Sequence, residues 1–251
     1  MTVFGYRIPL LVAPLVWAAL WEVVGRSGLV FLLPPFSAVL AATGELVASR
    51  KFAEAALLTL YIFAVGMAIS IAVGVPLGIL MGRVRAANQL LGMWVNLFVS
   101  APLTALVPVI MLLFGFGHTT MIVTVVLFAV WIIALDTYAG VRHVSPSLVD
   151  MARSFGASRA QLYGKVLIWA ALPEILAGIR LGVIRGVKGM IIGQLLISIV
   201  GLGELFELYS RNFLMEQFWA LTILVFAFAL LASEAIGMIE RRIEYYAGAR
   251  S

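Results

Sequence analysis

The chain contains no cysteine and only two histidines among its 251 residues. The absence of cysteine excludes disulfide bonds and thiolate metal sites. His118 and His143 fall in different predicted loops, so we expect no histidine-based metal site. Charged residues make up 12% of the chain, against roughly 25% in a soluble domain. So small a share of charge excludes an ordinary water-soluble domain.

The residues that are present are mainly apolar. Hydrophobic residues make up 63% of the chain, and its mean hydropathy is +1.11. A soluble core of this size would not bury so much apolar surface, so we expect an all-α integral membrane protein, a single domain over residues 1–251. The net charge of +5 does not indicate nucleic-acid binding, because the basic residues are not gathered with aromatics into one patch.

Six apolar segments approach the length of about 20 residues that a bilayer-spanning helix needs. Between the first two, Pro34 and Pro35 followed by Ser37 predict a turn and then a short surface helix. The first segment is expected to be retained, since no small-x-small cleavage site follows it. The predicted spans are residues 8–24, 57–81, 90–114, 121–138, 175–200 and 218–239, with the core of the domain at 57–240.

The distribution of basic residues predicts the orientation of these spans. The side with more lysine and arginine should face the cytoplasm. Both termini and the loop between the fourth and fifth spans would then be cytoplasmic. The richer side carries Arg7, Arg83, Arg85, Arg142, Arg153, Arg159, Lys165, Arg241, Arg242 and Arg250, and the other side carries Arg26, Arg50, Lys51 and Arg211.

That loop contains a polar stretch, "DMARSFGASRAQLYGKVLIWAALP". Ser147 and Asp150 can cap a helix that opens near Leu148, and Gly156 should end it. Ser158 can cap a second helix, and Pro173 marks the expected entry to the fifth span. A helix, a glycine hinge and a helix outside the membrane would suit a groove on a soluble partner. An amphipathic loop resting on the lipid surface is the alternative.

The same stretch resembles the EAA loop of permease subunits of bacterial ABC importers, whose pattern is E-A-A-x3-G-x9-I-x-L-P. Aspartate and methionine replace the first two letters, and Ile-Trp at 168–169 replaces Leu-Pro, although an "AALP" follows at 170–173. The phrases "LPPFSAVLAA" and "SAPLTALVPVIMLLFGFG" are similar to the sulfonate, taurine and nitrate importer branch. The matching positions are Asp150, Met151, Ala152, Gly156 and Val166.

The resemblance implies a type I ABC importer fold of about six transmembrane helices in a bacterial inner membrane. It implies that residues 145–173 form a cytoplasmic coupling loop that docks on a dimeric ABC ATPase. The other implied partners are a second permease copy and a periplasmic or lipid-anchored solute-binding protein, near whose docking face the "GLG" turn at Gly201 should lie. The coupling residues so implied are Asp150, Met151, Ala152, Arg153, Phe155, Gly156, Ala157 and Leu162.

The chain has no phosphate-binding loop of its own. In a search for G-x-x-x-x-G-K-[ST], Gly164 and Lys165 are followed by Val166, and Arg159 occupies the position of the first glycine. ATP and magnesium are therefore expected on the partner ATPase, and no cofactor is expected on this chain.

Charged residues inside the spans are candidates for function. Arg185 and Lys188 are three residues apart in the fifth span and share a face, and Arg185 falls near mid-depth. We interpret them, with Gln194 further outward, as a lining for an anionic solute. The alternatives are pairing with an acid (Asp136, Glu204 or Glu234) and snorkelling to a water-filled edge.

Two prolines in the third span, Pro102 and Pro108, should bend or break that helix, because proline lacks a backbone donor. Such breaks are tolerated where they line a cavity, so both prolines are candidate path residues. Simple helix kinks are the alternative.

Two other functions are open to a chain of this composition. "GRSG" at residues 25–28 fits the serine phrase of rhomboid-like intramembrane proteases, but Ser27 lies in a predicted loop and neither histidine lies inside a span. A secondary transporter driven by an ion gradient would need paired intramembrane carboxylates or an inverted repeat, and the sequence contains neither.

Overall fold

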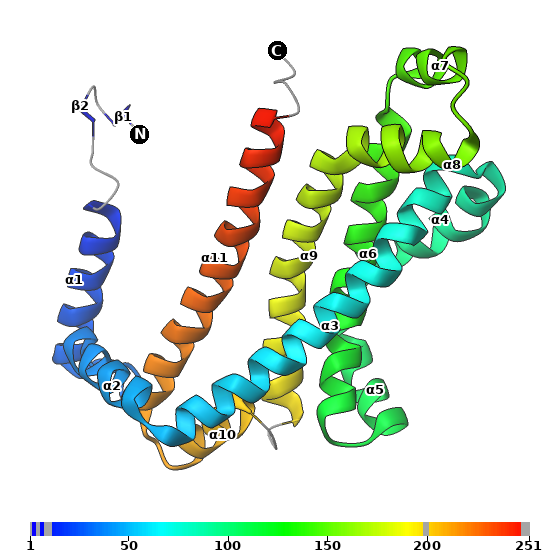
Figure 1. The fold of residues 1–251 in the computed structure, drawn as a ribbon. Coiled ribbons are helices and arrows are strands. Elements are labelled where there is room, and N and C mark those ends of the chain that lie inside the picture. The colour runs from blue at the N-terminus through cyan, green and yellow to red at the C-terminus, as the bar shows by residue number, and fades with distance from the viewer. Residues whose placement is uncertain (1, 4–5, 8–11, 198–200, 247–251) are drawn as a thin grey trace.

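The structure, a computed structural model, describes residues 2–3, 6–7, 12–197 and 201–246 (Figure 1). Two antiparallel two-residue strands, β1 (Thr2–Val3) and β2 (Tyr6–Arg7), precede the helices. The helices are α1 (Val12–Ser27), α2 (Phe36–Ala48), α3 (Arg50–Arg83), α4 (Arg85–Ser100), η1 (Leu103–Leu106), α5 (Val107–Phe114), α6 (His118–His143), α7 (Pro146–Ser154), α8 (Arg159–Gln161), η2 (Leu162–Leu167), α9 (Ile168–Ile197), α10 (Leu202–Arg211) and α11 (Met215–Tyr246).

Among the described residues, four helices are long and apolar enough to cross a membrane: α3, α6, the continuous helix Arg159–Leu196, and Met215–Met238 of α11. They contain the predicted spans at 57–81, 121–138, 175–200 and 218–239, except that residues 198–200 lie outside the described part. The predicted span at 90–114 is a pair of helices bent by 97°. Residues 8–11 of the first predicted span also lie outside, and the rest belongs to α1, a helix of 16 residues.

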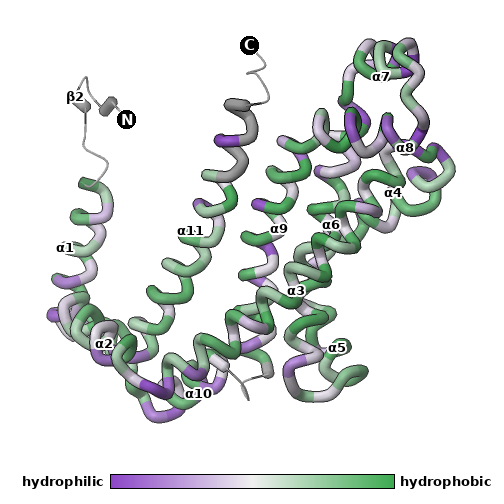
Figure 2. The backbone as a smooth tube through the Cα atoms, in the orientation of Figure 1, coloured by the Kyte–Doolittle hydropathy of each residue, from purple (hydrophilic) through white to green (hydrophobic). Residues whose placement is uncertain are grey.

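The long helices run between two ends of the molecule, and the α7 loop lies at one of them. In Figure 1, α1 and α9 run away from the end where α7 lies, and α3, α6 and α11 run back toward it. The helices α2 and α10 lie at the opposite end. Figure 2 shows hydrophilic positions in the α7–α8 region, in α10 and at points along α9. The polar segments therefore lie at the two ends of the molecule, and α9 also has hydrophilic positions between them.

Helix α6 is the centre of the bundle. Its apolar window is 56% buried, whereas the other three windows are between 17% and 33% buried. Glycines on both flanking helices let the backbones approach it closely, as small residues do in membrane helix pairs. A Cβ added to any of these glycines would lie between 2.5 and 2.9 Å from an atom of α6: Gly66, Gly74, Gly78 and Gly82 of α3, and Gly178, Gly182 and Gly189 of α9.

The tightest of these contacts predicts a strong effect on stability. A Cβ at Gly78 would lie 2.5 Å from the backbone oxygen of Ala134 and from Cβ of Thr137. Gly78→Ala should therefore destabilise the chain by about 1–3 kcal/mol, as overpacking does. Thermal unfolding of the detergent-solubilised protein measures this. Gly44→Ala is the matched control, because no atom lies within 4 Å of its Cβ; equal melting of both variants would contradict the prediction.

Helices α1 and α2 attach to the bundle through α11. Trp21 Nε1 donates a hydrogen bond to the carbonyl of Pro34 (2.9 Å), and Trp219 Nε1 donates to the carbonyl of Leu32 (2.9 Å). Val39 and Leu46 of α2 are buried in a cluster that includes residues of α10 and α11. The short helix predicted after the two prolines is thus confirmed, and one face of it is packed rather than free.

Candidate functional site

The loop between α6 and α9 is built around Gly156. This residue has φ +76°, in the left-handed region where glycine is favoured. Its N–H donates to the carbonyl of Arg153 (2.9 Å), and the N–H of Ala157 donates to the carbonyl of Ala152 (3.0 Å). This is the pair of bonds that closes a Schellman motif. The predicted glycine break is confirmed, and it fixes the angle at which the chain leaves α7.

The second helix of the loop begins as predicted. Ser158 Oγ accepts a hydrogen bond from the N–H of Gln161 (3.3 Å), while Gln161 Oε1 accepts from the N–H of Ser158 (2.9 Å). This reciprocal pair is a capping box. The chain then continues through the π-helical turn η2 into α9 without a break.

The predicted cap of the first helix in the loop is wrong. Helix α7 opens at Pro146 with Ser145 as its N-cap and no side-chain cap bond, so Ser147 and Asp150 do not cap it. Proline fits the first helical position, because the N–H that it lacks would have no partner there. Pro173 lies inside α9, which begins at Ile168; membrane helices tolerate an internal proline where neighbours satisfy the freed carbonyl. That it marks the entry to the fifth span stays a prediction.

The predicted coupling residues fall into two groups. Ala152 and Leu162 are buried in a cluster with α6 and α9, against which Ala157 packs. Met151 is 50% exposed and Phe155 is 86% exposed. Asp150 and Arg153 form a long, solvent-exposed ion pair of 3.8 Å, which contributes little to stability. One side of the loop therefore holds it to the spans, and the other presents an apolar patch with charges beside it.

Helix α9 carries two basic side chains, Arg185 and Lys188, near its middle. Arg185 is half-buried, and its Nη1 donates to the backbone carbonyl of Val99 at the end of α4 (3.2 Å). Lys188 is exposed. Within residues 12–197 and 201–246, neither side chain forms an ion pair within 4 Å. The acid Glu234 is instead paired with Arg180 at 3.5 Å.

Gln194 lies in a different setting from these two cations. Its side chain is 2% exposed, and its Nε2 donates to Oγ1 of Thr59 (2.7 Å). The same hydroxyl accepts from the N–H of Leu202 (3.1 Å), and a Cβ at Gly201 would lie 2.5 Å from it. Gln194 therefore joins α3, α9 and α10 in the packed interior of this chain, and its place along a solute path stays a prediction.

This junction supplies a second test of stability. Thr59→Val removes the acceptor of two buried N–H donors, and a buried donor left unpaired costs about 1–3 kcal/mol. We expect a lower thermal midpoint in detergent. Thr222→Val is the control, because the Thr222 hydroxyl only donates within its own helix, to Phe218. If the thermal midpoint falls no further for Thr59→Val than for the control, the two hydrogen bonds to Thr59 do not stabilise the fold.

The two prolines break the third predicted span as expected. Pro102 precedes the 3-10 turn η1, and Pro108 lies in the first turn of α5. Leu112 and Leu113 of α5 are 86% and 72% exposed, so the bent segment leaves an apolar surface uncovered in one chain.

The described residues do not assemble the catalytic sites considered as alternatives. Ser27 Oγ donates to the carbonyl of Val24 at the exposed end of α1 (2.7 Å), while His118 and His143 lie at the two ends of α6. A search of the described part of the chain finds no group of three His, Cys, Asp or Glu side chains that could hold a metal ion.

The sequence is similar to those of known transport permeases. Residues 74–245 match the family described as the binding-protein-dependent transport system inner membrane component. The chain is 28% identical over 236 residues to the putative aliphatic sulfonates transport permease protein SsuC of Bacillus subtilis (strain 168), a match that covers 93% of this chain and 85% of SsuC. It is 29% identical over 175 residues to the taurine transport system permease protein TauC of Escherichia coli (strain K12), covering 70% and 64%.

The fold is also similar to solved structures. An inward-facing structure of the MetNI methionine ABC transporter superposes with a TM-score of 0.62 at 20% identity, covering 74% of this chain and 93% of that chain. A crystal structure of an amino acid ABC transporter with histidines gives 0.62 at 19% identity, covering 76% and 93%. The helices and the loop thus define a membrane-embedded transport permease of the type I importer fold. The chain belongs to the binding-protein-dependent transport system inner membrane component family, and it is a permease subunit of an ABC import system.

Proposed function

We propose that this permease imports a small anionic solute of the sulfonate or taurine type, driven by a separate ATPase that docks on the α7–Gly156–α8 loop. The observation that carries the docking proposal is the exposed pair Met151 and Phe155 on a loop whose other side packs against the spans. An apolar patch with a charged rim is typical of an interaction site. A force applied there would reach α6 and α9 through buried contacts.

The solute class follows from the charges within the bundle. Arg185 and Lys188 are cations that no acid within the described residues neutralises by a close ion pair, and an unpaired cation at mid-membrane costs roughly 3 kcal/mol or more. Water and an anionic solute would both lower that cost. The names of SsuC and TauC, which refer to aliphatic sulfonates and to taurine, agree with an anionic group.

The partners follow from the same proposal. ATP and Mg²⁺ would bind to the ATPase, and no cofactor would bind to this chain. A periplasmic or lipid-anchored solute-binding protein would dock at the end where α10 lies, opposite α7. With α7 in the cytoplasm, the positive-inside rule gives cytoplasmic termini in a bacterial inner membrane.

The assembly is proposed to be a homodimer. One chain presents one coupling loop, whereas an ATPase dimer offers two clefts, and a C₂ pair is the simplest closed arrangement. We expect the intact complex to contain two copies of this chain by native mass measurement. A single copy paired with a different permease would contradict the homodimer while leaving the import function intact.

The deciding experiment is reconstitution in vesicles with the separate ATPase and a binding protein. We expect ATP hydrolysis only when the ATPase chain is present, and uptake of an alkanesulfonate that stops when ATP is withheld. Uptake driven by an ion gradient without ATP would instead identify a secondary transporter. Uptake of a cationic solute in preference to the sulfonate would overturn the proposed solute class.

A further inference from the structure

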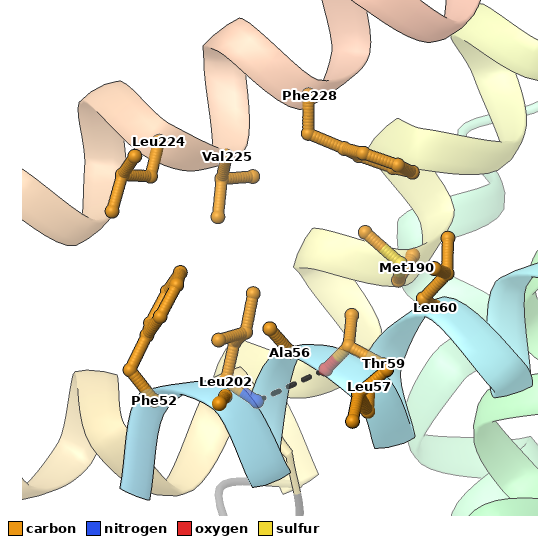
Figure 3. A pocket seen from close by; sticks show the side chains of 11 residues that line it. Phe52, Ala56, Leu57, Thr59, Leu60, Met190, Leu202, Leu224, Val225 and Phe228 are labelled. Atoms are coloured by element: carbon orange, nitrogen blue, oxygen red, sulfur yellow. Dashed lines mark hydrogen bonds between the residues drawn. The ribbon is translucent and has the colours of Figure 1, made fainter. Parts of the chain in front are cut away.

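An apolar pocket lies at the end of the bundle opposite α7, where α3, α9, α10 and α11 meet. Its volume is about 470 Å³. In Figure 3, Leu224, Val225 and Phe228 of α11 stand across the pocket from Phe52 and Ala56 of α3. Residues of both α3 and α11 line the pocket, and these two helices diverge from this end toward the α7 end (Figure 1).

The lining excludes the charged group of a solute. Of the eleven described residues that line the pocket, ten are apolar and Thr59 has a polar side chain. The Thr59 oxygen is buried and already accepts the hydrogen bonds from Gln194 and Leu202. None of these described lining residues is charged, so a sulfonate or carboxylate among them would lie without a counter-charge, at a large desolvation cost. The pocket therefore suits a hydrocarbon chain.

The surroundings indicate where that hydrocarbon comes from. Leu57 is 66% exposed and Leu60 is 46% exposed, so the pocket opens onto the apolar outer surface of α3. The residue before Phe52 is Lys51, an exposed cation in the first turn of α3. Its neighbour Arg50 is engaged by Glu54 at 2.7 Å. A phosphate near Lys51 would also lie near the positive end of the α3 dipole.

We propose that this pocket binds one acyl chain of a phospholipid from the leaflet opposite the α7 loop, with the lipid phosphate at Lys51. The bound chain fills the angle between α3 and α11 and thereby sets their separation at this end. The site is independent of which solute the permease carries.

The test uses the full chain reconstituted in vesicles of phosphatidylethanolamine and phosphatidylglycerol, extracted in mild detergent and measured by native mass spectrometry. The wild type is expected to retain one phospholipid per chain. Ala56→Trp should lose it, because the indole fills the pocket. Ala68→Trp is the matched control on the same helix, since Ala68 is exposed and does not line the pocket. Lys51→Gln should lower the retained fraction about fivefold, which corresponds to about 1 kcal/mol for one cation near a lipid surface.

Three results would overturn the site. The first is a wild type that retains no phospholipid, and the second is an Ala56→Trp variant that retains as much as the Ala68→Trp control. If Ala56→Trp does not fold, Leu224→Trp fills the same pocket from α11 and carries the comparison. The third is a disulfide between two copies of a Leu57→Cys variant in the membrane, which would show that a second copy covers the pocket. The chain has no other cysteine, so that cross-link is unambiguous.

Discussion

Gly156→Pro is expected to reduce ATP-driven uptake in reconstituted vesicles at least about tenfold while ATP hydrolysis by the assembled complex continues. Gly156 has φ +76°, and proline is locked near −65°. Proline also lacks the N–H that donates to the carbonyl of Arg153. The Schellman end of α7 would therefore be lost. Phe155 and Met151 would then point in directions that the ATPase does not match.

Gly156→Asn is the control for this experiment. Asparagine tolerates the left-handed conformation better than other side chains, and nothing lies within 4 Å of a Cβ at this position. Near-normal uptake by the asparagine variant would show that the backbone angle matters rather than the glycine itself. Normal uptake by the proline variant would remove the loop from the coupling mechanism. Failure of the proline variant to insert would show that the loop is needed for folding instead.

The end of α7 at Gly156 and the start of the next helix at Ser158 can both be predicted from the sequence. A glycine that ends a helix and a serine with glutamine three residues later act through local backbone geometry, which a short stretch specifies by itself. The start of α7 is harder to predict, because Ser145, Ser147 and Asp150 are all acceptable caps and Pro146 decides between them. The exposure of Phe155 is also not a local property, since it depends on which side of α7 packs against α6 and α9.

The surroundings of polar residues inside the spans cannot be predicted from the sequence alone. Gln194, Arg185 and Lys188 are equally unexpected in an apolar helix, and each is a candidate for function on that ground. Their surroundings differ because of distant partners: Gln194 bonds to Thr59, 135 positions away. The close approach of the α3 and α9 glycines to α6 cannot be predicted either, because the sequence shows the glycines but not the α6 atoms that they approach. The break of 97° at Pro102 was predictable in kind, but its angle depends on packing.

The Arg185→Gln, Lys188→Gln double variant is expected to lower uptake of the native solute at least about tenfold, while basal ATP hydrolysis by the complex survives. Removing the two cations removes the counter-charge for an anion at mid-membrane, where an unpaired charge costs roughly 3 kcal/mol. Uptake rates at several solute concentrations measure the effect. Arg180→Gln is the control from the same helix, because Arg180 pairs with Glu234 at 3.5 Å; its loss should lower the thermal midpoint and leave the concentration dependence of uptake unchanged.

The alternative role of the cations predicts a different pattern. If Arg185 mainly neutralises Asp136, Arg185→Gln should lower the thermal midpoint, and adding Asp136→Asn should restore it. The bond from Arg185 to the carbonyl of Val99 would be lost in either case, so the single variant should show some destabilisation under both readings. Lys188 distinguishes a role in the solute path from a role in ion pairing, because it is exposed and has no acid within ion-pair distance in the described part of the chain. Lys188→Gln should therefore reduce uptake without changing the midpoint, and wild-type uptake by the double variant would end the proposal of a basic solute path.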